Sequence, residues 1–220
     1  MTPSLHAGSS RERGASTSYE RAVGAFNAGK LEEALRLAAA AEEENPKKPD
    51  IPNLRGAILT GQKRYDEAAE QFNSALKLDP NFYQAKLNLA EIDLRRGKYA
   101  EAAQRYEEMQ QLDPESEILQ FKLILCDLLS GDIDAASARA DVMKFPGNTP
   151  AYYFARAAVA LKQGNKDRAQ TYFENLKKYY AEEQRVYFLR SLKDLGLLDE
   201  HSSEATKPQN QQDKKSSDEN

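Results

Sequence analysis

The sequence predicts an all-α protein, a solenoid of about five helix-turn-helix repeats closed by one further helix. Three observations predict this fold class. Alanine, leucine, glutamate, lysine and glutamine, all strong helix formers, dominate the middle of the 220-residue chain. One short pattern returns five times at an almost constant spacing. Within each unit, a turn separates two amphipathic helical patterns, and it bears a glycine in four of the five units.

The repeat is clearest at five alanines, which are spaced 34, 34, 34 and 33 residues apart: Ala34, Ala68, Ala102, Ala136 and Ala169. Four residues after each comes either another alanine or a large ring: Ala38, Phe72, Tyr106, Ala140 and Phe173. A small residue lets two helices approach closely, and a ring fills the adjoining gap. Because no hairpin buries its apolar face alone, neighbouring repeats must stack.

The units occupy residues 15–48, 49–82, 83–116, 117–149 and 150–183. The first three close with Asn45-Pro46, Asp79-Pro80 and Asp113-Pro114. The fourth has bulky Ile124 at the small position of its first helix and ends in Phe145-Pro146-Gly147. We therefore expect either the packing of this unit or its turn into the fifth unit to be irregular.

These units resemble tetratricopeptide repeats, whose period is 34 residues. The second and third match best, with Gly56 and Ala90 at the small position. The resemblance covers residues 15–183 and implies a right-handed α-solenoid. It also implies a concave surface, lined by the first helix of every repeat, on which such proteins bind their partners.

The last repeat needs a cover, and residues 182–196 are predicted to form a capping helix. Its expected apolar stripe is Val186, Leu189 and Leu192, and Gly196 is the expected stop. Residues 1–14 and 199–220 are polar and are predicted to be disordered.

Composition excludes several classes of protein. The net charge of −4 arises from 31 basic and 35 acidic residues that are interspersed, so nucleic-acid binding is not expected. No window is apolar enough for a membrane span, and the N-terminus lacks a secretory signal. We expect a cytoplasmic protein, unless an upstream export signal is missing from this start. The single cysteine, Cys126, is expected to be a small buried hydrophobe rather than a reactive thiol.

The residues needed for catalysis are also missing. The two histidines, His6 and His201, lie in the predicted disordered ends, and the chain has no glycine-rich phosphate loop. We therefore expect no enzyme activity, no metal site and no cofactor.

Asp93 and Asp127 occupy equivalent positions in successive first helices, where the family usually has a large apolar residue. Either they form a shared acidic site for a cation or basic partner, or each is solvated or hydrogen-bonded locally.

The resemblance assigns a partner-binding groove to the first helices: Tyr19, Val23, Phe26, Asn53, Leu87, Glu91, Leu94, Phe121, Leu125, Leu128, Phe154 and Leu161. One branch of the family grips the C-terminal carboxylate of chaperones with lysine, asparagine and arginine on these helices. The matching positions here are Tyr19, Val23, Ala57, Leu87 and Glu91, so the clamp is absent.

The groove instead contains an apolar strip, defined as Phe121, Leu125, Leu128, Phe154 and Leu161. Exposed strips of this kind tend to be binding sites, and a peptide or an amphipathic helix is the natural ligand. The alternative is that the strip belongs to the repeat core or that a chain terminus covers it.

The leading hypothesis is a non-catalytic scaffold or adaptor that binds a segment of another protein in this apolar groove. The alternatives are a structural protein that self-associates through the strip, as a homo-oligomer, and a chaperone for exported or assembly subunits.

Overall fold

The computed structural model describes residues 17–198, and within this range it contains eleven helices and no strand. The all-α class is therefore confirmed. The segments 1–14 and 199–220, for which the sequence predicts disorder, lie outside the described residues.

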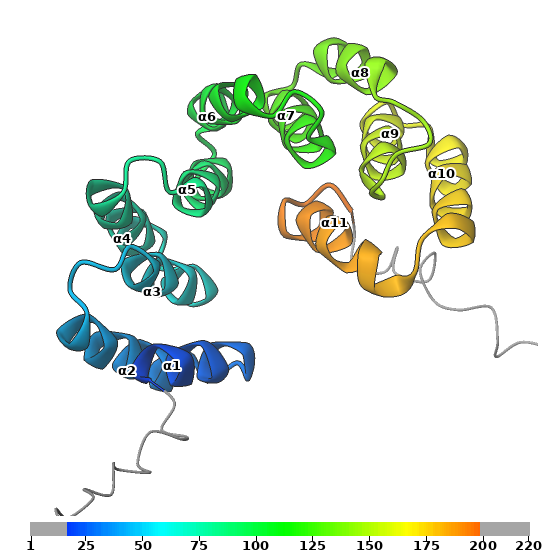
Figure 1. Cartoon of the computed structure of the whole chain (residues 1–220). Coiled ribbons are helices and arrows are strands. Elements are labelled where there is room, and N and C mark those ends of the chain that lie inside the picture. Colours follow the sequence, from blue (N-terminus) through cyan, green and yellow to red (C-terminus); the bar gives the residue numbers. More distant parts are fainter. Residues whose placement is uncertain (1–16, 199–220) are drawn as a thin grey trace, which may run out of the picture. The chain divides into compact units, whose positions relative to one another are not determined.

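The first ten helices form five consecutive pairs, one in each 34-residue unit (Figure 1). They are α1 (Ser18–Asn27), α2 (Leu31–Glu44), α3 (Asp50–Gly61), α4 (Tyr65–Leu78), α5 (Tyr83–Arg95), α6 (Tyr99–Leu112), α7 (Glu117–Ser130), α8 (Ile133–Val142), α9 (Ala151–Lys162) and α10 (Lys166–Tyr179). The last helix, α11, spans Glu182–Asp194.

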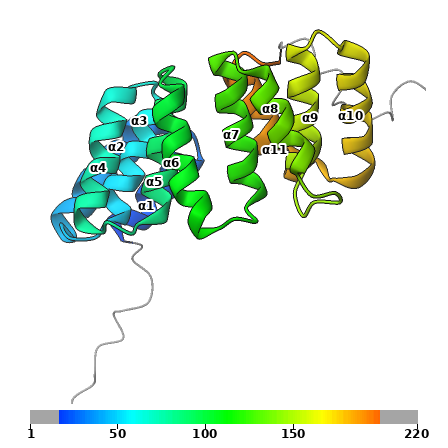
Figure 2. The ribbon, with the colours of Figure 1, turned by 90° about the horizontal axis from the view of Figure 1, so that it is seen from above.

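The chain divides into two compact units inside α5, between Ile92 and Asp93. Unit 1 contains α1 to α4 and most of α5, and unit 2 contains the end of α5 and α6 to α11. In unit 2, α7, α8, α9 and α10 run side by side, and α11 crosses behind them (Figure 2).

Close packing within a pair depends on the small position that the repeat pattern singles out. Gly56 of α3 lies against the ring of Phe72 of α4, and a Cβ added there would come within 2.5 Å of that ring. Phe72 is itself buried. The interface therefore has room for a hydrogen atom but not for a methyl group.

The turn between the two helices of a pair needs left-handed backbone. Four of the five equivalent turn positions hold a glycine with φ between 73° and 92°: Gly29, Gly97, Gly131 and Gly164. The second repeat has Lys63 at this position, with φ 62°. A side chain with a Cβ is disfavoured in this region, so Lys63 adopts a strained conformation.

The end of the fourth repeat is irregular, which is one of the two possibilities that its sequence leaves open. Helix α8 has 10 residues where α6 and α10 have 14. The Glu117 carboxylate accepts hydrogen bonds from the backbone N–H groups of Asn148 at 2.6 Å and Thr149 at 2.8 Å. The Tyr180 hydroxyl donates to the Gly147 carbonyl at 2.9 Å. The side chains of Glu117 in α7 and of Tyr180, which follows α10, thus hold the segment that lacks a regular turn.

Candidate functional site

The predicted groove residues fall into two groups, one in each compact unit. Those of unit 1 lie on the first-helix face of unit 1, which we define by the half-buried residues Tyr19, Val23, Phe26, Asn53, Leu87 and Glu91 of α1, α3 and α5. Those of unit 2 are Leu94 and the apolar strip.

On α1, the side chains of Tyr19, Val23 and Phe26 pack partly against the core formed with α2 and α3. The Lys48 ammonium lies 4.3 Å from the centre of the Tyr19 ring. Burial and the nearby Asp50 carboxylate raise the pKa of the Tyr19 hydroxyl, so it remains a neutral hydrogen-bond donor at physiological pH. This end of the face therefore combines an aromatic ring with charges of both signs.

An amide pair joins α3 to α5. Asn88 Nδ2 donates to Asn53 Oδ1 at 2.9 Å, and both side chains are half-buried. Asn53 is among the predicted groove residues, but Asn88 was missed. The signal that could have found Asn88 is its spacing of 35 residues from Asn53, one repeat and one residue further along.

In unit 2 the apolar strip is not exposed, so of the two alternatives given above, burial is the one observed. Phe121, Leu125 and Phe154 are fully buried, Leu94 and Leu128 are nearly so, and Leu161 packs against the same core. Assignment to a helix face tells which side chains point the same way, but not what covers them.

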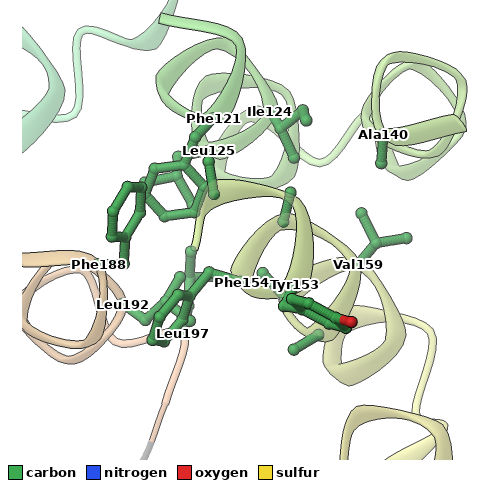
Figure 3. Packing of buried hydrophobic residues seen from close by; sticks show 14 of the residues in the cluster. Phe121, Ile124, Leu125, Ala140, Tyr153, Phe154, Val159, Phe188, Leu192 and Leu197 are labelled. Carbon is green, nitrogen blue, oxygen red and sulfur yellow. The ribbon is translucent and has the colours of Figure 1, made fainter. Parts of the chain in front are cut away.

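Part of the strip belongs to the repeat core, and α11 covers its Phe121 and Phe154. The Phe188 ring of α11 lies 5.1 Å from that of Phe121 and 5.5 Å from that of Phe154, measured between ring centres. Figure 3 shows Phe188 and Leu192 directed into the same cluster as Phe121, Leu125 and Phe154.

The buried stripe of α11 also differs from the predicted one. Phe188, Ser191 and Leu192 are buried, whereas Val186 is 51% exposed and Leu189 is only partly buried. The helix is therefore turned so that its phenylalanine, the largest apolar side chain it carries, faces α7 and α9.

Asp93 and Asp127 do not form a shared acidic site. Asp93 pairs with Arg105 at 2.8 Å, and Asp127 pairs with Arg139 at 2.9 Å. The two arginines are themselves 34 residues apart, so the repeat places a base on the second helix opposite each acid on the first. Burial nevertheless raises the pKa of Asp127, with Arg139 opposing the shift. Local pairing, the second interpretation given above, is confirmed.

Comparison with known families agrees with the repeat. One tetratricopeptide repeat family model matches residues 19–81 and 58–117, and a second matches residues 93–143. Together they cover residues 19–143, more than half of the chain. The chain belongs to the tetratricopeptide repeat family.

Solved structures share the TPR fold at low sequence identity. A tetratricopeptide repeat protein from Parabacteroides merdae has a TM-score of 0.63 at 23% identity, over 82% of this chain and 69% of that one. TTC0263, a TPR protein from Thermus thermophilus, has a TM-score of 0.62 at 20% identity, over 80% and 97%. YrrB, described as a TPR protein with an unusual peptide-binding site, has a TM-score of 0.53 at 16% identity, over 80% and 90%.

TPR folds generally mediate protein–protein interactions and are generally not catalytic. Between residues 17 and 198, no group of three or more His, Cys, Asp or Glu side chains could hold a metal ion. Both histidines lie outside that range, and Cys126 is buried. Among the described helices, none combines the length and apolarity of a membrane span.

Proposed function

We propose that this TPR protein is a scaffold or adaptor that binds an extended segment of another protein on the first-helix face of unit 1. The observation that carries the proposal is the half-buried amide pair Asn53–Asn88. A carboxamide has the same N–H donors and C=O acceptor as a peptide group, so this pair can hydrogen-bond to the main chain of an extended ligand.

Apolar side chains share this face with the amide pair. Tyr19, Val23 and Leu87 are half-buried, so each keeps part of its side chain available for contact. Main-chain hydrogen bonds supply affinity without regard to sequence, and apolar side-chain contacts supply selectivity. YrrB, similar in fold, supports a peptide as the class of ligand.

The test compares capture by the wild-type chain with capture by an Asn53→Ala/Asn88→Ala variant. Proteins from a native lysate are identified by mass spectrometry, and the affinity of each is then measured with purified components. Loss of two hydrogen bonds, each contributing about 1 kcal/mol, predicts roughly tenfold or greater weakening.

Asn73→Ala is the matched control, since it removes an exposed asparagine on α4 without touching the first-helix face. Every genuine partner is expected to bind this control as it binds the wild type. A partner that binds all three chains equally would show that the amide pair plays no part in recognition.

A further inference from the structure

The position of α11 in unit 2 differs from that of a cap. A cap that continued the array would stack on α10, the last helix of the fifth pair. Instead α11 lies across α7 and α9, the first helices of two successive repeats. Phe121 and Phe154, which its Phe188 contacts, are equivalent positions 33 residues apart. One side chain of α11 thus bridges two repeats at the same repeat position, which is how a ligand binds a repeat surface.

Three polar contacts fix the orientation of α11 on this surface. The Lys122 ammonium of α7 donates to the Ser191 hydroxyl at 3.3 Å and lies 5.1 Å from the centre of the Tyr187 ring. Beyond the end of the apolar stripe, Arg95 pairs with Asp194 at 3.0 Å. The residues of α11 that contact this surface are Phe188, Ser191 and Leu192 at positions i, i+3 and i+4, followed by the acid Asp194 at i+6.

The joint before α11 permits release without disturbing the repeats. Helix α10 ends at Tyr179, and Tyr180 is anchored by its hydroxyl on Gly147 and by its ring against Tyr153, 6.2 Å away. Ala181, exposed and extended, is the single residue between this anchor and α11. Rotation at Ala181, together with withdrawal of Leu197 and Leu198 from the same cluster, would detach α11 while Tyr180 and α10 stay in place.

We propose that the α7–α9 face is a binding site for an amphipathic helix and that α11 is its built-in occupant. A partner helix carrying the same Phe, Ser and Leu pattern displaces α11 and takes its place. Without any occupant, Phe121, Leu125 and Phe154 would form an exposed apolar patch, so the exchange of one helix for another keeps the face covered. This site is distinct from the first-helix face of unit 1.

The probe is a fluorescent peptide of residues 181–198, titrated into full-length chains and followed by anisotropy. The wild type binds it weakly because α11 competes from within the same molecule. Phe188→Asp removes the main anchor of α11, and Asp194→Arg sets two positive charges against each other without touching the core. Both chains are expected to bind the peptide roughly tenfold or more tightly than the wild type does.

Two controls isolate the mechanism. Val186→Asp alters only the exposed side of α11 and leaves the wild-type affinity unchanged. A peptide carrying Phe188→Asp binds none of the chains. In the wild type, excess peptide increases hydrogen exchange in α11 and leaves α9 protected.

The proposal is wrong if Asp194→Arg, with native helix content by circular dichroism, binds the peptide no better than the wild type does. It is equally wrong if α11 stays protected in the wild type at peptide concentrations well above those that saturate Asp194→Arg. Because Asp194 is a surface residue, this variant decides the matter even if Phe188→Asp fails to fold.

Discussion

The turn after each first helix shows how much a single residue can depend on backbone conformation. Glycine holds this turn in four of the five repeats, and Lys63 holds it in the second at φ 62°. A repeat alignment identifies the position, but only the observed φ shows that the lysine is strained. The second repeat keeps its helix pair because the packing around α3 and α4 outweighs the strain at one residue.

Lys63→Gly is expected to stabilise unit 1 by about 0.5–1 kcal/mol, because glycine adopts this backbone conformation without steric cost. The gain is limited by the larger entropy of glycine in the unfolded chain. Chemical denaturation measures it. Lys63→Ala is the control and should not stabilise the protein, since alanine keeps the Cβ. A stabilising alanine would mean that the lysine charge, not the backbone, is responsible.

Polar pairs between helices were harder to predict than the turns. The sequence shows that Asp93 and Asp127 are equivalent, yet it leaves open whether they act together. Their partners Arg105 and Arg139 lie on the following helices. The sequence separation between each acid and its arginine does not show that they pair until the packing of the two helices is known. The same limit explains why Asn88 was missed as the partner of Asn53.

The helix pair is the element that the sequence predicts best. Small residues at fixed positions, an alanine or a ring four residues after the shared alanine, and turns at a constant spacing all follow from local geometry. The contact between Gly56 and Phe72 is the structural counterpart of that pattern. Such a contact joins neighbouring helices and needs no knowledge of more distant segments.

Gly56→Ala is expected to destabilise unit 1 by about 1–3 kcal/mol, although alanine is the better helix former. The added methyl would lie 2.5 Å from the buried Phe72 ring, which must move. Thermal denaturation gives the sign. Gly24→Ala serves as the control, because a Cβ at Gly24 of α1 meets nothing within 4 Å and alanine should raise helix stability there. Equal effects of both changes would contradict the close approach of α3 and α4.

Helix α11 shows where prediction at the level of elements stops. Its sequence carries two overlapping apolar stripes, the predicted one with Val186, Leu189 and Leu192, and another with Phe188, Leu192 and, just after the helix, Leu195. Helical periodicity allows either stripe to be buried. The choice depends on the surface that α11 contacts, and Phe188 fits between the rings of Phe121 and Phe154.

At the scale of the whole molecule, stability in a repeat protein is distributed among neighbouring contacts. Phe154 lies at the centre of such contacts in unit 2, between Phe173 of α10 and Phe188 of α11. Its position identifies it as a core residue rather than as part of a free surface.

Phe154→Ala is therefore expected to cost about 3–5 kcal/mol. The loss of protection, followed by hydrogen exchange, should be concentrated in α7 to α11, and α3 and α4 of unit 1 should exchange as in the wild type. Val142→Ala, at a strongly exposed position of α8, should change little. A Phe154→Ala chain as stable as the wild type would show that Phe154 is a surface residue and not part of the core.

The helix content, the pairing of helices at a 34-residue period and the small position filled by Gly56 were apparent from the residues alone. They could be predicted because each depends on side chains within one repeat or between adjacent ones. The burial of the apolar strip could not, since it depends in part on where a helix more than 20 residues further along the chain packs. Periodicity identifies the side chains that share a face. Whether that face is buried depends on the free energy gained by the segment that packs against it, and periodicity says nothing about that segment. Here that segment is α11. Of the predicted groove, the residues that remain partly exposed are therefore those of the first-helix face of unit 1.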